Sequence, residues 1–251
     1  RGVSNGPRPD WMARRLTAIG QRPISALVDI TNYVMFDLGR PLHAYDIDKI
    51  HGDELVVRQA KGGEPFAALN EKTYEMEAGM ITIGDAEGVD DLAGVMGGER
   101  TGVSDDTTGM FLEIAVFDPI SVATTGRKLN LNSDARYRFE RGLDSESPVW
   151  AAGHIARLVV AICGGEASVP VTMGPGVDWQ RSIFLGSGKV ESLTGMVIEA
   201  GEQQRILEAL GFAVTAADGG FDVAPPAWRG DIDGAADLVE EIGRIRGFDH
   251  L

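Results

Sequence analysis

The stretch ISALVDITNYVMFDLGRPLHAYD, residues 24–46, contains the change of pattern that decides the fold. Its first part predicts a helix over 24–38, because a mainly apolar set recurs at helical spacing: Ile24, Leu27, Val28, Thr31, Val34, Met35 and Leu38. Gly39 then supplies the stop signal of a helix end. From about residue 42 onward, short strand-like runs replace the helical pattern. The stretch therefore predicts an α+β protein.

The same signals extend in both directions. We expect a helix over 9–19 before this stretch, and after it strands within 54–60, 80–86, 91–98 and 110–117. Helices are predicted at 118–129, 134–141 and 146–163, followed by a strand pair at 166–173. A domain boundary is expected at 174–181. Beyond it we expect a helix over 200–210, a hairpin turning at DGGF (218–221), and a final helix over 233–246.

Composition limits the functional classes. The net charge is −15, which argues against a general nucleic-acid binder. Residues 120–145 run against this trend, with five Arg or Lys against three Asp or Glu, and they form either a local basic surface or a solvated helix face.

The single cysteine, Cys163, excludes an internal disulfide and is expected in the core of a cytoplasmic protein. No apolar run approaches the roughly 18 residues of a membrane span. The chain starts with Arg1 and stops after RGFDHL, so we expect a piece of a longer polypeptide.

Familiar catalytic motifs are absent from the sequence. It has no P-loop, dinucleotide fingerprint, HExxH or GxSxG pattern. The segment VMGGERTG, residues 95–102, is rich in glycine but lacks the Lys-Ser/Thr of a phosphate cradle, so its glycines are expected to permit a tight bend or a close backbone approach. Composition and spacing alone predict an α+β domain followed by a small, mainly helical domain.

Four separated stretches, in this order, carry a more specific signal. They are RPISALVDITNYVMFDLGRPLHAYDIDKI (22–50), GVMGGERTGVSDDTT (94–108), SDARYRFERGLD (133–144) and APPAWRGDIDGAADLVEEIGRIRGF (224–248). Together they resemble the β chain of bacterial phenylalanyl-tRNA synthetase. The resemblance implies a mixed helix and β-sandwich-like B3/B4 editing module over 1–174. A small winged-helix-like B5 domain over 180–251 would follow it.

The resemblance implies that the B3/B4 module hydrolyses tyrosine wrongly esterified to tRNA(Phe). Glu113, an isolated acid in the apolar run GMFLEIAVF, then matches the residue that recognises the tyrosine hydroxyl; from the residues alone it could equally be an edge-strand glutamate facing water. His43 matches a pocket residue that orders the attacking water, and alone it could be a structural histidine. Asp46 is our guess for its carboxylate partner. The remaining pocket positions are Arg22, Gly97, Ser133 and Ala135, with Ser133 standing where well-known members have threonine.

The second domain carries acids at metal-binding positions of the family. Asp231, Asp237, Glu240 and Glu241 match magnesium ligands of a site shared with the α subunit; without the resemblance they are acids near a helix N-terminus, balanced by Arg244. Residues 180–251 hold 12 acids against 6 bases, so this domain is not expected to bind nucleic acid directly.

The resemblance also implies an assembly. The partners would be the α subunit, in an α2β2 heterotetramer, and tRNA(Phe), and ATP would be used only by the complete enzyme. Two alternatives to the editing function remain open. One is a non-catalytic scaffold that contacts tRNA within the heterotetramer. The other is a free-standing deacylase, which the appended B5 domain argues against.

Overall fold

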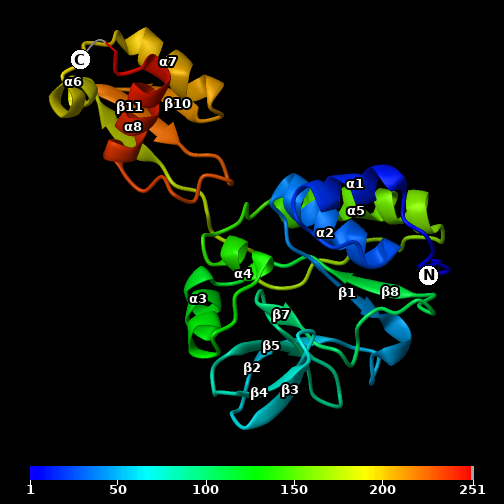
Figure 1. The fold of residues 1–251 in the computed structure, drawn as a ribbon. Coiled ribbons are helices and arrows are strands. Elements are labelled where there is room, and N and C mark those ends of the chain that lie inside the picture. Colours follow the sequence, from blue (N-terminus) through cyan, green and yellow to red (C-terminus); the bar gives the residue numbers. More distant parts are fainter. Residues whose placement is uncertain (250–251) are drawn as a thin grey trace. The chain divides into compact units, whose positions relative to one another are not determined.

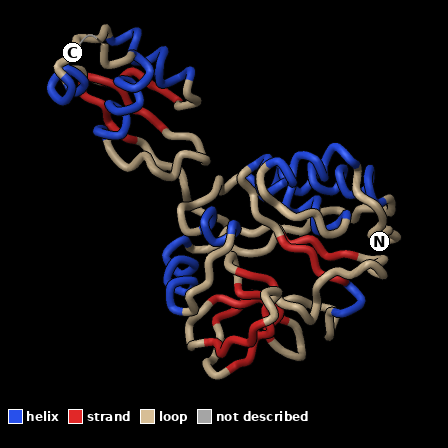
Figure 2. The backbone as a smooth tube through the Cα atoms, viewed as in Figure 1, coloured by secondary structure: helices blue, strands red, loops and turns tan. Residues whose placement is uncertain are grey.

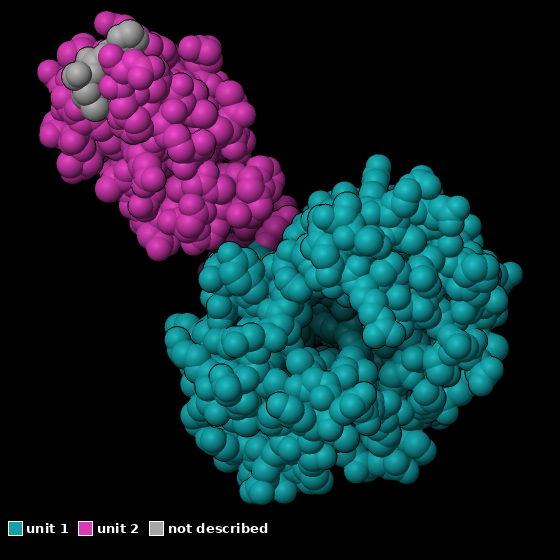
Figure 3. All heavy atoms as spheres, in the orientation of Figure 1, with its two compact units in different colours: residues 1–143, 147–173 teal, residues 144–146, 174–251 magenta. Residues whose placement is uncertain are grey.

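The protein, described by a computed structural model for residues 1–249, divides into two compact units. Unit 1 comprises residues 1–143 and 147–173, and unit 2 comprises 144–146 and the chain from 174 onward (Figure 3). Each unit combines helices with antiparallel strands, which confirms the α+β class (Figures 1 and 2). Within residues 1–249, no helix has the length and apolar character that crossing a membrane requires.

Three helices form one layer of unit 1: α1 (Asp10–Ala18), α2 (Ala26–Leu38) and α5 (Ser147–Cys163) (Figure 1). They share a core that includes Met12, Leu27, Ile30, Val34 and Ile155. The two helices expected at the start of the chain are confirmed, and Gly39 ends α2 in the left-handed conformation at φ 64°. The predicted apolar face of α2 is wrong in part. Ile24 lies before the helix and is exposed, while the buried ridge runs through Leu27, Ile30 and Val34.

A two-stranded antiparallel sheet lies between the two cores of unit 1. Strand β1 (His43–Asp46) pairs with β8 (Met110–Glu113), and the short 3₁₀ helix η1 (Ile47–Lys49) follows β1. Side chains alternate between the two faces of a strand. Leu112 accordingly packs against the helical core, whereas Tyr45 belongs to the second core, beneath the other face.

That second core is covered by a four-stranded antiparallel sheet in the order β2 (Val56–Gln59), β5 (Ile81–Gly84), β6 (Val89–Leu92) and β7 (Met96–Gly97). A hairpin of β3 (Glu64–Ala68) and β4 (Lys72–Met76), which the sequence analysis missed, completes it. The expected single strand over 91–98 is wrong. The chain turns at Gly94, with φ 70°, and β6 pairs with β7 as a tight hairpin that places Asp91 opposite Gly97.

Two shorter helices close unit 1 beside this sheet. Helix α3 (Pro119–Lys128) is capped by Asp118, whose side chain accepts a hydrogen bond from the Ser121 N–H at 2.8 Å, and Pro119 occupies its first turn. Helix α4 (Asp134–Phe139) is capped in the same way by Ser133. The predicted strand pair at 166–173 is wrong, because this segment has no regular structure and Val169 is 83% exposed. Strand propensity without a partner strand or a buried face does not form a sheet.

Unit 2 has its own core. Strands β9 (Ile183–Gly186), β10 (Ala213–Ala217) and β11 (Gly220–Ala224) form an antiparallel sheet in the order β10-β11-β9. Helices α6 (Lys189–Thr194), α7 (Ala200–Ala209) and α8 (Ala235–Arg246) pack around it through Val190, Leu207 and Leu238. The expected hairpin at 218–221 is confirmed, since Ala217 pairs with Gly220 and Gly219 adopts φ 75°.

Candidate functional site

The pairing of β1 with β8 places His43 directly opposite Glu113. Two residues along, Tyr45 stands opposite Phe111, so all four side chains share the sheet face that looks away from the helical layer. The space-filling view of unit 1 shows a hollow that, in the common orientation of Figures 1 and 3, lies between β1 and β7. The register thus brings together two candidate residues that are 70 positions apart in the sequence.

Gly97 lies against the imidazole of His43. A Cβ atom added at Gly97 would come within 2.2 Å of Cε1 of His43 and within 2.8 Å of both ring nitrogens. No side chain larger than hydrogen fits at that distance. The close backbone approach expected of the glycine-rich segment is therefore confirmed at this position, and it is directed at the candidate histidine.

The His43 side chain is mostly buried, at 19% exposure. The ring of Tyr45 packs edge-on against it, with the centroids 4.5 Å apart and an interplanar angle of 79°. Burial lowers the pKa of His43 to about 4, so the imidazole is neutral at physiological pH. Its Nε2 atom has no hydrogen-bond partner in the part of the chain that the structure describes. A buried polar atom left in this state is costly unless a ligand completes it.

Glu113 is similarly buried. Burial raises the pKa of its carboxyl to about 7, opposed by the positive charge of Arg40 and by a backbone hydrogen bond from Ala115. Arg40 is itself held by hydrogen bonds to the Ala115 carbonyl and to Oγ of Ser147, the latter at 3.1 Å. The Oε1 atom of Glu113 has no partner within residues 1–249. Glu113 therefore holds one acceptor atom that the described residues leave unsatisfied.

The acid that accompanies His43 was not evident from the sequence. Oδ2 of Asp91, on β6, lies 3.9 Å from Nδ1 of His43. The guess of Asp46 is wrong, because its carboxylate instead accepts hydrogen bonds from Thr107 Oγ1 at 2.7 Å and from the Asp48 N–H at 3.1 Å. Asp91 could have been found only by recognising that 91–98 folds back at Gly94, which carries the acid next to the histidine.

The other pocket candidates surround this group less directly. Ser133 caps α4 by accepting from the Arg136 N–H at 3.0 Å, and its hydroxyl donates to the Val95 carbonyl at 2.6 Å. It thereby ties α4 to the segment that leads into Gly97. Ala135 packs against the core beneath the sheet. Arg22 is exposed in the loop between α1 and α2, where the neighbouring Gln21 reaches Asp134 at 3.4 Å.

The four carboxylates expected to bind magnesium are not gathered into a metal site. Among residues 1–249, no group of three or more His, Cys, Asp or Glu side chains could hold a metal ion. Asp231 pairs with Arg229 at 2.6 Å, and Glu241 pairs with Arg229 at 3.1 Å and with Arg244. Asp237 accepts hydrogen bonds from the Asp233 and Gly234 N–H groups at the start of α8. Arginine and backbone donors thus contact three of the four carboxylates, and the fourth, Glu240, is exposed on α8.

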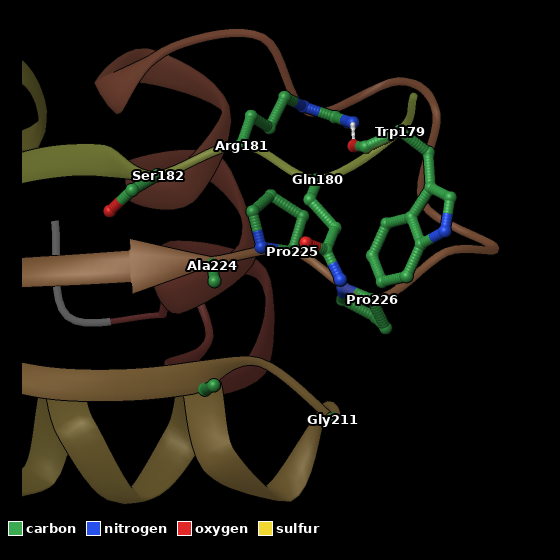
Figure 4. A pocket seen from close by; sticks show the side chains of 9 residues that line it. Trp179, Gln180, Arg181, Ser182, Gly211, Ala224, Pro225 and Pro226 are labelled. Carbon is green, nitrogen blue, oxygen red and sulfur yellow. Dashed lines mark hydrogen bonds between the residues drawn. The ribbon is translucent and has the colours of Figure 1, made fainter. Parts of the chain in front are cut away.

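Unit 2 also contains a shallow cavity of about 500 Å³ (Figure 4). Its lining residues are Trp179, Gln180, Arg181, Ser182, Gly211, Ala213, Ala224, Pro225 and Pro226. The only charged lining group is the guanidinium of Arg181, which donates to the carbonyls of Trp179, Arg229 and Ile232. This cavity therefore offers no acid or base, and its one hydroxyl, that of Ser182, has no base beside it among the lining residues.

Comparison with known proteins places these observations in a family. Residues 1–164 match the B3/4 domain. The chain belongs to the B3/4 domain family. Residues 183–248 match the tRNA synthetase B5 domain. The B3/4 match therefore includes His43, Gly97, Glu113 and Ser133, and the B5 match includes the four carboxylates of unit 2.

Curated relatives of this B3/4 and B5 chain are phenylalanine–tRNA ligase beta subunits. Those of Paramagnetospirillum magneticum and Ruegeria pomeroyi are 50% and 47% identical over 251 residues, which is 100% of this chain. That of Rhodospirillum rubrum is 48% identical over 99% of this chain. The chain spans 31% of the length of each of these relatives. A solved N-terminal fragment of the phenylalanyl-tRNA synthetase beta-subunit from Pyrococcus horikoshii aligns with 96% of this chain and 68% of its own, at 16% identity and TM-score 0.41. The curated relatives and the two domain matches confirm the expected resemblance to the β chain of bacterial phenylalanyl-tRNA synthetase.

Proposed function

We propose that this chain is part of a phenylalanine–tRNA ligase beta subunit and that unit 1 hydrolyses tyrosine wrongly attached to tRNA(Phe). The proposed editing module extends over residues 1–174. The observation that carries the proposal is the buried pair His43 and Glu113, which stand opposite each other with one unpartnered polar atom each. A ligand that is itself polar at two points would supply a partner to each of these buried atoms.

Glu113 would supply the selectivity. A pocket that admits phenylalanine cannot strongly exclude tyrosine, because one added hydroxyl changes binding by only roughly a hundredfold. A site that selects for the tyrosine hydroxyl, and so rejects phenylalanine, discriminates more strongly. If Oε1 of Glu113 accepts the tyrosine hydroxyl, a phenylalanine leaves that buried oxygen unpaired, which costs about 1–3 kcal/mol or more for a charged group. Correctly charged tRNA would thus be spared.

His43 would position the attacking water. Hydrolysis adds water to the ester carbonyl, breaks the bond to the terminal ribose oxygen, and releases tyrosine and free tRNA. Because the pKa of His43 is about 4, its imidazole is neutral at physiological pH and offers one donor and one acceptor. A terminal ribose hydroxyl of the tRNA would assist the water. We therefore assign His43 to ordering the water rather than to removing its proton.

The remaining predicted residues would shape the pocket and hold the tRNA end. Gly97 leaves room beside His43, Ser133 fixes the segment before Gly97, and Ala135 keeps the adjoining wall small. Arg22 is exposed and carries a charge suited to a phosphate of the tRNA. We place this reaction in the cytoplasm.

Unit 2, proposed as a B5 domain over residues 180–251, would serve assembly rather than chemistry. We propose that it contacts the α subunit of an α2β2 heterotetramer, in which ATP is used by the complete enzyme. Its four carboxylates do not fit a preformed magnesium cage, because Arg229, Arg244 and backbone donors already occupy three of them. Magnesium bound by the complete enzyme would therefore need either ligands from another chain or rearranged arginines.

The deciding experiment is deacylation of Tyr-tRNA(Phe) and Phe-tRNA(Phe) by the 251-residue chain and by Glu113→Ala. We expect selective release of tyrosine, and we expect Glu113→Ala to lose that selectivity. Phe111→Ala is the matched control, because Phe111 lies on the same face of the same strand without a polar group. If the assembled α2β2 enzyme carrying wild-type unit 1 also released no tyrosine, the chain would be a non-catalytic scaffold that contacts tRNA.

A further inference from the structure

Asp91 is a buried acid that the proposed reaction does not yet use. It comes from β6, and its backbone pairs with Gly97, the residue that lies against the ring of His43. Its side chain is 7% exposed. Oδ2 lies 3.9 Å from Nδ1 of His43, and the carboxyl also interacts with the hydroxyl of Tyr45. The acid therefore approaches the imidazole from the side opposite to the unpartnered Nε2.

The charges around Asp91 are acidic. It faces His43 and Tyr45 from β1, Glu113 from β8 and the adjacent Asp90 on its own strand. Asp90 has its own cation, Arg100, at 2.5 Å, whereas no Lys or Arg within residues 1–249 forms an ion pair with Asp91. A buried carboxyl among other acids and without a cation favours its neutral, protonated form. Consistently, burial and the charge of Glu113 raise the pKa of Asp91 well above its ordinary value, although a hydrogen bond with Tyr45 acts in the opposite direction.

A protonated carboxyl is a hydrogen-bond donor. We propose that Asp91 is a positioning residue for His43, whose carboxyl group donates to Nδ1 and so holds the imidazole in the tautomer that carries its proton on Nε2. The 3.9 Å separation is longer than a hydrogen bond, so the proposal requires the two groups to approach each other further. Catalytic hydrogen bonds are often this long in the absence of substrate.

The tautomer determines what His43 can do. With Nδ1 accepting from Asp91, Nε2 is a donor, and it can hold the oxygen of the attacking water or of the ester carbonyl. An ionised Asp91 would give the reverse tautomer, with Nε2 as a proton acceptor. The placement of Asp91 therefore assigns His43 to hydrogen-bond donation. The catalytic value of this inference rests on the proposed editing function, but the tautomer itself does not.

The test is ¹⁵N NMR of the imidazole nitrogens in the histidine-labelled 251-residue chain at pH 7, with His43 assigned by the loss of its signals in His43→Gln. We expect wild-type His43 to be protonated on Nε2. Asp91→Asn should keep that tautomer, because an amide N–H can donate in place of the carboxyl. Asp91→Ala should give a mixture of tautomers. Asp46→Ala is the matched control, since it removes a buried acid from the same strand as His43 without touching the ring.

A wild-type His43 protonated on Nδ1, or a tautomer unchanged by Asp91→Ala, would overturn the proposal. The wild-type spectrum shows which ring nitrogen of His43 is protonated, so it tests the proposal even if Asp91→Ala fails to fold. In the deacylation assay we expect Asp91→Ala to lower kcat roughly tenfold or more, as a misplaced imidazole tautomer does elsewhere, and Asp91→Asn to restore most of it. A wild-type chain with the expected tautomer but no deacylation in the assembled enzyme would instead contradict the editing function and leave the Asp91 contact intact.

Discussion

Burying Glu113 costs stability, and the same burial makes it a selective acceptor. Its Oε1 atom has no protein donor within residues 1–249. The positive charge of Arg40 offsets the burial only in part, since the pKa of Glu113 stays raised, at about 7. The residue is thus poised between its neutral and ionised forms at working pH, and a ligand hydroxyl adds the missing donor to the ionised form.

This titration gives a prediction for activity. Because the ionised carboxylate is the better acceptor, tyrosine release from Tyr-tRNA should increase as the pH rises from about 6 to about 8. The rate for Glu113→Gln should be lower and flat over this range. Blank reactions without protein correct for spontaneous ester hydrolysis. A wild-type profile as flat as that of Glu113→Gln would contradict ionisation of Glu113 as the source of recognition.

The same shift predicts how folding stability depends on pH. The folded pKa of Glu113 lies above the unfolded value near 4.5, so its contribution is fully present below pH 4.5 and is lost as the pH rises through about 7. His43 acts oppositely, since its pKa is lowered to about 4, and its contribution is lost as the pH falls from about 6.5 to about 4. Comparing the urea unfolding of wild type with that of Glu113→Gln isolates the contribution of Glu113 to the free energy of unfolding. We expect wild type to lose roughly 1–3 kcal/mol relative to the variant between about pH 4.5 and 7.

The close contact between Gly97 and His43 gives a further prediction for a single residue. In Gly97→Ala the new Cβ would overlap Cε1 of His43, so the ring or β7 must move. We expect a large loss of tyrosine deacylation and a destabilisation of about 1–3 kcal/mol, measured by assay and urea unfolding. Gly102→Ala is the control, because its Cβ would meet nothing closer than 3.4 Å. Full activity in Gly97→Ala would mean that the position of His43 does not matter for hydrolysis.

The candidate site was only partly predictable from single residues. Sequence reasoning singled out His43 and Glu113 as unusual polar residues in apolar runs, and the family resemblance assigned their roles. Neither the sequence pattern nor the resemblance could locate Asp91. An acid at one end of a strand-like run is common, and Asp91 comes close to His43 only because the run 91–98 turns back on itself. The partner of His43 was sought in the nearest acid along the chain, Asp46, but alternation turns that side chain toward Thr107 instead.

At the scale of elements, helices were predicted more accurately than strands. Helices of unit 1 carry local signals for where they begin and end. Gly39 marks the end of α2, and Asp118 with Pro119 marks the beginning of α3. Strands depend on partners that are distant in sequence. The β3–β4 hairpin was missed because the buried residues Phe66 and Ala68 alternate with exposed residues that are themselves not polar, Pro65 and Ala67, so the sequence shows no polar–apolar alternation. The segment 166–173 has strand-forming residues but no partner strand, and it stays irregular.

The N-cap of α4 gives a prediction about a single helix. Ser133→Ala removes both the cap of α4 and the hydrogen bond to the Val95 carbonyl, so the segment leading to Gly97 loses its anchor. We expect about 1 kcal/mol of destabilisation together with weaker tyrosine deacylation. Asp118→Ala is the matched control, because it removes the equivalent cap of α3 and should cost similar stability with deacylation intact. Equal deacylation by the two variants would mean that Ser133 acts only as a cap.

At the scale of the whole molecule, the two units have separate cores. The core residues of unit 2, which include Leu207, belong to a cluster distinct from the two clusters of unit 1. The sequence analysis expected a boundary at 174–181 from its glycine, proline and polar residues. That segment has no regular structure, and the compact units part at residue 174.

Separate cores predict separate unfolding. Leu207→Ala and Leu27→Ala each remove a fully buried leucine, one from unit 2 and one from the helical core of unit 1. Each should cost about 2–5 kcal/mol within its own unit. In hydrogen exchange, Leu207→Ala should reduce protection in 183–246 alone and leave tyrosine deacylation unchanged. Leu27→Ala should reduce protection in 10–163 and lower deacylation, because α2 and α5 support the β1–β8 pair that holds His43 and Glu113. Loss of protection throughout the chain from either variant would show that the units unfold cooperatively, and unit 2 would then stabilise the site as well as serve assembly.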